Sequence, residues 1–151
     1  AEGVWQGPLH LALYVPPESL VPQDARQVQA TFDESADLMG SETSRKDGLT
    51  VTLYWRGIRE LAADYSVFVH VIDRSGVIVA QHDGQPQNAG RPTSTWEDGE
   101  VVRDEHVIAL PPGLPPGEYR LATGMYEPAS GKRLTLGDER DILDIGSVQL
   151  P

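Results

Sequence analysis

Apolar and polar residues alternate along most of this chain after Val28, in short runs divided by turn-forming residues. In the run 49–55 leucine, valine and tryptophan take every second position, so they share one face of a strand and Tyr54 falls on the other. Similar runs predict further strands at 28–32, 36–39, 65–73, 77–82, 100–110, 118–127, 132–136 and 145–150.

The segments between these runs read as connections. Asp73–Gly76 and Pro128–Gly131 have the composition of tight turns, and the stretches 40–48 and 83–95 read as polar loops. Residues 59–64 suit one helical turn, and no longer stretch has a helical period. The pattern predicts an all-β fold, an antiparallel β-sandwich of about eight strands that is immunoglobulin-like or jelly-roll-like.

The chain of 151 residues fits one domain. Residues 1–27 contain four of the prolines (Pro8, Pro16, Pro17 and Pro22) and read as a lead-in or linker, in which 9–15 is one possible edge strand. Residues 28–151 are then the sandwich domain.

One strand has two apolar faces. Val67, Val69 and Val71 form the natural core face, while Phe68, His70 and Ile72 occupy the alternate positions. Such a second face is either covered by another layer or used to bind a ligand. Within this chain the alternating segment Leu9–Val15 is the predicted cover.

Composition excludes several functions. The formal charge of −11 makes nucleic acid and anionic lipid poor partners, because both are bound through lysine and arginine. The absence of cysteine excludes disulfides, a thiolate zinc site and a cysteine nucleophile. No cofactor, metal site or catalytic residue is predicted, because no nucleotide-binding, nucleophile-elbow or zinc-protease motif is present.

The carboxylates leave two softer alternatives open. Glu97, Asp98, Glu100 and Asp104 are candidates for a glycosidase pair, which needs two carboxylates at a set separation across a cleft, and nothing in the sequence fixes such a distance. The loop 83–88 offers oxygen ligands for calcium. Turn formation explains most of these residues without any ligand.

Five residues are candidates for ligand binding: Trp96, His82, Asp83, Tyr54 and His70. Trp96 follows a polar loop, so it either plugs the end of the core or forms a stacking platform for a sugar ring. Tyr54 and His70 lie on strand faces opposite the predicted core. His82 ends the predicted strand 77–82, and Asp83 begins the loop that follows.

Several segments resemble a β-sandwich domain of large bacterial (Chloroflexi-type) multi-pass membrane proteins that are similar to family 39 glycosyltransferases, of the dolichyl-phosphate-mannose/aminoarabinose-transferase type. The segments are LTVTLYWR at 49–56, YSVFVH at 65–70, VAQHDGQP at 79–86, PTSTW at 92–96, GEVVRD at 99–104, LPPGEYRL at 114–121 and GMYEP at 124–128. Met39-Gly40-Ser41 departs from the Leu-Gly-Tyr of this pattern, which puts any ligand role there in doubt.

This resemblance implies a non-catalytic accessory module outside the cytoplasm, at the cell surface or in a periplasm-like space, tethered to the membrane in the full-length protein. Its expected partner is a glycan or the membrane portion of its own polypeptide. A purely structural or protein-interaction domain with no ligand is the alternative, and a hydrolase is a remote one.

Overall fold

The computed structural model describes residues 20–151, and they form the predicted antiparallel β-sandwich. The strands are β1 (Arg26–Phe32), β2 (Ala36–Ser44), β3 (Leu49–Gly57), β4 (Ser66–Ile72), β5 (Ile78–Gly84), β6 (Val101–Ile108), β7 (Gly117–Tyr126) and β8 (Leu143–Leu150), with a 3₁₀ turn, η2 (Thr93–Thr95), before β6. β1 begins at Arg26, within the range read as a lead-in, whereas the predicted edge strand 9–15 lies outside the described residues.

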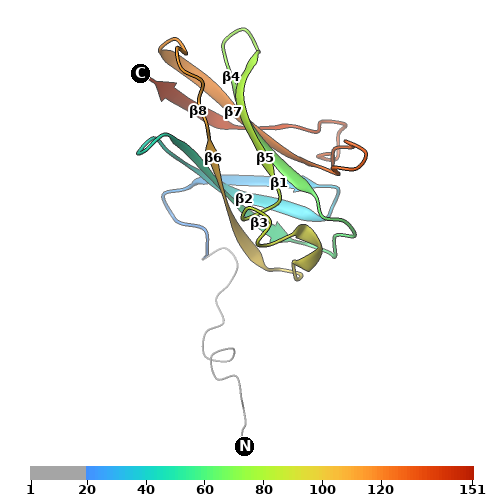
Figure 1. The fold of residues 1–151 in the computed structure, drawn as a ribbon. Coiled ribbons are helices and arrows are strands. Elements are labelled where there is room, and N and C mark those ends of the chain that lie inside the picture. Colours follow the sequence, from blue (N-terminus) through green and yellow to red (C-terminus); the bar gives the residue numbers. More distant parts are fainter. Residues whose placement is uncertain (1–19) are drawn as a thin grey trace, which may run out of the picture.

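The strands form two sheets of four, in the orders β1-β2-β3-β6 and β5-β4-β7-β8, which pack face to face (Figure 1). On one side of the sandwich the edge strands β5 and β6 come together. The other two edge strands, β1 and β8, border the opposite side. No hydrogen bond or ion pair joins β1 to β8 within residues 20–151, so this side is open.

Three local predictions were wrong. β2 continues to Ser44 because Ser41–Ser44 pair with β3 residue by residue, although their composition suggested a loop. Residues 59–64 form bends and no helical turn. There the Thr93 hydroxyl donates to the Ala63 carbonyl oxygen and accepts from the Tyr65 amide, which replaces helical hydrogen bonds. The stretch 132–136 contributes only a single bridge to β7.

The core is built around Trp55. Its side chain is fully buried, its ring lies edge-on to Phe32 at 5.6 Å between centroids, and Trp96 packs beside it at 6.5 Å. The alternation in 49–55 therefore predicted the inward face of β3 correctly.

The second face of β4 is covered by the segment 127–142, which connects β7 to β8. The guanidinium carbon of Arg133 lies 4.5 Å from the centre of the Phe68 ring. At Gly124 an added Cβ would lie 2.5 Å from the Phe68 ring and 2.8 Å from the carbonyl oxygen of Asp141. Glycine at this position therefore lets the covering segment approach the sheet closely.

We expect Trp55→Ala to lower the free energy of unfolding by about 3–5 kcal/mol, because it leaves a large cavity in the core. Urea denaturation followed by circular dichroism measures this. The control Val107→Ala, at a position that is 60% exposed, should change stability by less than about 0.5 kcal/mol. A loss below about 1 kcal/mol for Trp55→Ala would contradict its role at the centre of the core.

We expect Gly124→Ala to cost about 1–3 kcal/mol of stability, because the new methyl group displaces Phe68 or the backbone at Asp141. Gly84→Ala in β5 is the matched control, since its methyl group would meet only His82, at 3.6 Å. If the two variants unfold at the same urea concentration, the covering segment does not press on Phe68.

Candidate functional site

Two consecutive residues of β5 supply polar side chains to opposite faces of one sheet. Val69, on the core face of β4, pairs with His82, and Phe68, on the outer face, pairs with Asp83. His82 therefore points between the sheets, toward β6, while Asp83 points outward. The sequence placed Asp83 in a loop, but β5 continues to Gly84, so the strand directs the two side chains to opposite faces.

His82 ends a hydrogen-bonded chain that crosses from one sheet to the other. Its Nδ1 lies 2.8 Å from Nδ1 of His106, whose Nε2 lies 2.7 Å from Oδ2 of Asp104. Asp104 is completely buried, and two further donors reach it: Trp55 Nε1 at 3.3 Å and the backbone amide of Gln87 at 2.9 Å. This chain closes the β5–β6 side of the sandwich.

The Gln87 amide reaches Asp104 through a loop with unusual backbone angles. Gln87, Asn88 and Ala89 have φ values of 56°, 54° and 71°, in the left-handed region that residues other than glycine seldom adopt. The hydrogen bond to the buried carboxylate is one compensation for this strain.

The two imidazoles can hold a limited number of protons. Nε2 of His106 donates to Asp104, so its Nδ1 accepts when the ring is neutral, and Nδ1 of His82 then donates. Two imidazolium rings cannot share this contact, because both Nδ1 atoms would carry protons. A proton on Nε2 of His82 leaves this contact intact.

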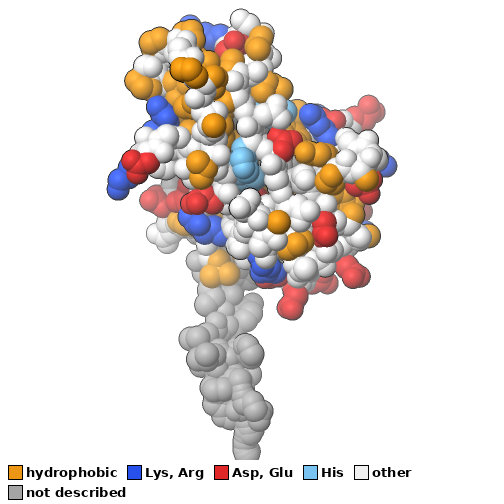
Figure 2. All heavy atoms as spheres, in the orientation of Figure 1, with side chains coloured by type: hydrophobic (Ala, Val, Ile, Leu, Met, Phe, Trp, Pro, Cys, Tyr) orange, Lys and Arg blue, Asp and Glu red, His pale blue; other side chains and the backbone are white. Residues whose placement is uncertain are grey.

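Burial lowers the pKa of His82, and the neighbouring His106 lowers it further, against the opposing effects of Asp104 and Asp83. A carboxylate–imidazole chain of this kind suits a general base. A catalytic base also needs a substrate cavity beside it, and His82 is absent from the lining of five grooves on the surface of residues 20–151. Histidine atoms do reach the surface in the middle of the face drawn in Figure 2.

On the outer face of β4, His70 stacks against Phe68 at 4.4 Å between ring centres. Asp83 accepts hydrogen bonds from the Tyr126 hydroxyl and the Gln81 amide, each at 2.8 Å. Nδ1 of His70 is buried without a hydrogen-bond partner, and burial lowers the pKa of the ring. Apart from this atom of His70, the hydrogen bonds in the cluster are formed between its own side chains.

The two predicted aromatic ligand residues are buried. Trp96 is 6% exposed and donates from Nε1 to the Arg91 carbonyl oxygen at 3.0 Å, so it plugs the end of the core. Tyr54 is 3% exposed and packs with Met39 in a small cluster on the outer face of the first sheet, with its hydroxyl bonded to Glu42. Neither offers a flat aromatic surface to a ligand.

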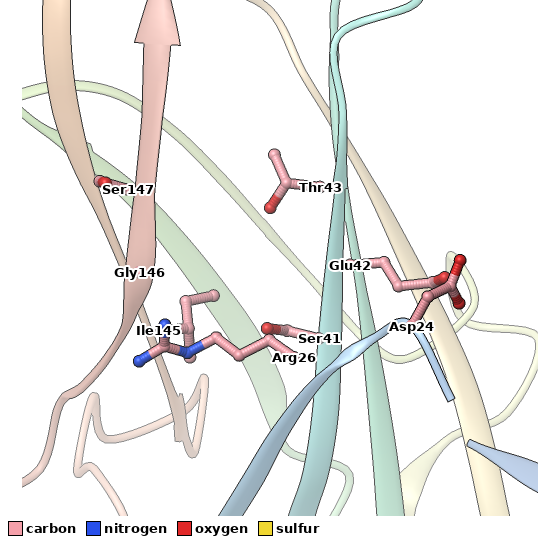
Figure 3. Close-up of a pocket in the computed structure, with 8 residues that line it drawn as sticks. All are labelled: Asp24, Arg26, Ser41, Glu42, Thr43, Ile145, Gly146 and Ser147. Atoms are coloured by element: carbon pink, nitrogen blue, oxygen red, sulfur yellow. The ribbon is translucent and has the colours of Figure 1, made fainter. Parts of the chain in front are cut away.

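A groove of about 370 Å³ opens on the β1–β8 side. Its lining residues are Asp24, Arg26, Ser41, Glu42, Thr43, Ile145, Gly146 and Ser147 (Figure 3). The Arg26 side chain extends from the start of β1 toward β8, whereas Asp24 and Glu42 turn away from it. Among the described residues, no cluster of three or more histidine and acidic side chains is placed to hold a metal ion.

The sequence carried a signal for part of this arrangement. Asp104 and His106 alternate with Val102 and Ile108 on the inward face of β6, and two ionisable residues on an apolar face indicate a buried polar contact. Arg26 had no such signal, because its position depends on an irregularity in β8, a strand more than a hundred residues away.

No protein-family model and no curated protein matches the chain. One solved structure that it resembles is an endonuclease/exonuclease/phosphatase from Beutenbergia cavernae DSM 12333, with 22% sequence identity and a TM-score of 0.36. The match covers 85% of this chain and 27% of that protein, so the chain spans about a quarter of its length. A likeness this weak assigns no activity.

The prediction of a non-catalytic accessory module that binds glycan is wrong at the residues on which it depended. Trp96 and Tyr54 are buried, so the aromatic surface on which a sugar ring was expected to stack is absent from them. The resemblance to glycosyltransferase-like membrane proteins and the extracytoplasmic, membrane-tethered location stay predictions. In the described part of the chain no helix is long and apolar enough to cross a membrane.

We expect the free energy of unfolding to fall as the pH drops below about 6.5, the ordinary pKa of histidine. His82 and His70 both have lowered pKa values in the folded protein, so below this pH the unfolded chain binds more protons. His82→Gln should flatten the slope of stability against pH between about pH 5 and 6.5.

Urea unfolding at several pH values measures this slope, which is the informative quantity because loss of the His106 contact also lowers stability at every pH. Ser75→Ala, in the exposed turn between β4 and β5, should leave the slope unchanged. An unaltered slope in His82→Gln would show that His82 binds protons equally in the folded and unfolded states.

Proposed function

We propose that this domain is a binding module that holds a carboxylate-bearing ligand in the groove between β1 and β8. The observation that carries the proposal is Arg26. Most described arginines, such as Arg56, Arg91 and Arg133, form ion pairs with carboxylates. Within residues 20–151 Arg26 has neither an ion pair nor a hydrogen-bonded partner, and it lines the groove.

The position of Arg26 depends on Gly146. β8 has an irregularity at this point, since Leu121 pairs with Gly146 while Ala122 pairs with Asp144. Gly146 has φ of +115°, and an added Cβ would lie 3.4 Å from Nη1 of Arg26 and 3.7 Å from Cζ. The guanidinium therefore lies against bare backbone, and its donors remain available to a ligand.

The chemistry of the lining favours a carboxylate. A guanidinium binds a carboxylate through two parallel hydrogen bonds, and the groove adds the hydroxyls of Ser41 and Thr43. Asp24 and Glu42 at its rim, together with the net charge of −11, repel a doubly charged anion more than a singly charged one.

We expect N-acetyl-leucine to shift the amide resonances of Ser41, Gly146 and Ser147 in a ¹H–¹⁵N NMR titration, and Arg26→Gln to weaken binding at least tenfold. A hydrogen bond to a charged group contributes about 1.5–3 kcal/mol, which supports a change of this size. Arg26→Lys should bind with intermediate affinity, because an ammonium group cannot form the paired contact.

Arg120→Gln is the matched control, since Arg120 is also an exposed arginine beside β8 but pairs with Asp144, at 3.7 Å. It should bind like the unaltered protein. N-acetyl-leucinamide, which lacks the carboxylate, should bind neither to Arg120→Gln nor to the unaltered protein. Equal affinities in Arg26→Gln and the unaltered protein would overturn the proposal.

A further inference from the structure

We infer that the ligand of this groove is the carboxyl end of an extended peptide, which pairs with the free edge of β8 and places its terminal carboxylate on Arg26. This inference rests on the proposed function and adds the class of ligand. It combines two observations made within residues 20–151: one edge of β8 has no strand partner, and the Arg26 guanidinium beside that edge has no ion pair.

Within residues 20–151 β8 is the last strand of its sheet and pairs only with β7, so its other side presents backbone groups without strand partners there. Proteins protect such edges with lysine, proline or a covering segment. In β8 the residues from Ile145 to Leu150 include no proline and no charged side chain. An edge of this composition can accept an added strand.

The other edge strands are less suitable. The contact between His82 and His106 joins β5 to β6, and it occupies the side from which a peptide would approach these two strands. In β1 the register with β2 shifts between Gln27 and Ala30, which interrupts its ladder. Beyond the irregularity at Gly146, β8 pairs with β7 in regular register up to Leu150.

The direction of the peptide follows from the place of Arg26. β8 runs from Leu143 to Leu150, and Arg26 lies against Gly146, at the start of the stretch that pairs regularly with β7 up to Leu150. A peptide antiparallel to β8 would run from the level of Leu150 to that of Gly146, so its last residue would reach the guanidinium. A parallel peptide would bring its amino group there instead, and two positive charges would meet.

The groove also indicates the side chains of the peptide. Val28 and Ala30 of β1 are only partly buried, although they pack against the core. Alternate side chains of a strand added at β8 would point toward them. Small apolar residues at every second position would cover this surface, and the remaining positions would face water.

The probe is the acetylated pentapeptide Val-Thr-Val-Thr-Val with a free carboxyl end, tested on the whole chain by fluorescence anisotropy and NMR. We expect it to bind at least tenfold more tightly than N-acetyl-valine. Methylation of the alternate backbone nitrogens that face β8 should lower the affinity of the peptide at least tenfold. The amide protons of β8 that do not bond to β7 should become protected from hydrogen exchange.

The carboxyl end is tested separately. The same peptide with a C-terminal amide should bind at least tenfold more weakly to the unaltered protein. In Arg26→Gln the acid and the amide should bind alike, and Arg120→Gln should keep the preference for the acid.

Two outcomes would overturn the inference. If N-acetyl-valine binds as tightly as the pentapeptide and methylation has no effect, the groove takes a small carboxylate and the proposed function stands alone. If sedimentation shows a dimer that the pentapeptide dissociates, the edge of β8 serves a second copy of the chain. A different result would show that the proposed function itself is wrong: N-acetyl-leucine would bind equally well to Arg26→Gln and to the unaltered protein.

Discussion

The hydrogen bonds to the buried carboxylate of Asp104 are the interaction on which the rest of this sandwich depends. An ionised carboxylate inside a protein is costly unless donors surround it, and these donors come from three separate parts of the chain. Trp55 in β3, His106 in β6 and the Gln87 amide in the loop after β5 all converge on it. Satisfying this one group fixes the central tryptophan, the inward face of β6 and the path of a strained loop.

A consequence is that the two sides of the sandwich differ. His82 extends the Asp104–His106 pair across the gap between the sheets, so the β5–β6 side is closed by a hydrogen bond. The β1–β8 side has no such link among the described residues, and the groove with Arg26 opens there. The closed side is held by this hydrogen bond, and the open side leaves room for a ligand beside an edge of β8 that has no strand partner within residues 20–151.

The outer face of β4 shows how the chain handles apolar surface that the sandwich cannot bury. Phe68 and Ile72 face away from the other sheet, yet both are buried. The segment 127–142 returns across this face, with Arg133 above the Phe68 ring and Gly124 allowing close approach. The burial of this face accounts for its hydrophobicity without an external ligand.

The sequence by itself determined the fold class, the inward face of β3 and the need to cover the second face of β4, because alternation of side chains is a local property of a strand. The alternation along β6 also carried a signal that Asp104 and His106 share its inward face. Only the tertiary structure decided that His82 meets His106 while Asp83 and His70 face away, since this depends on which strands become neighbours. It alone placed Arg26 against Gly146, because that contact joins the two ends of the described chain through a shift in strand register.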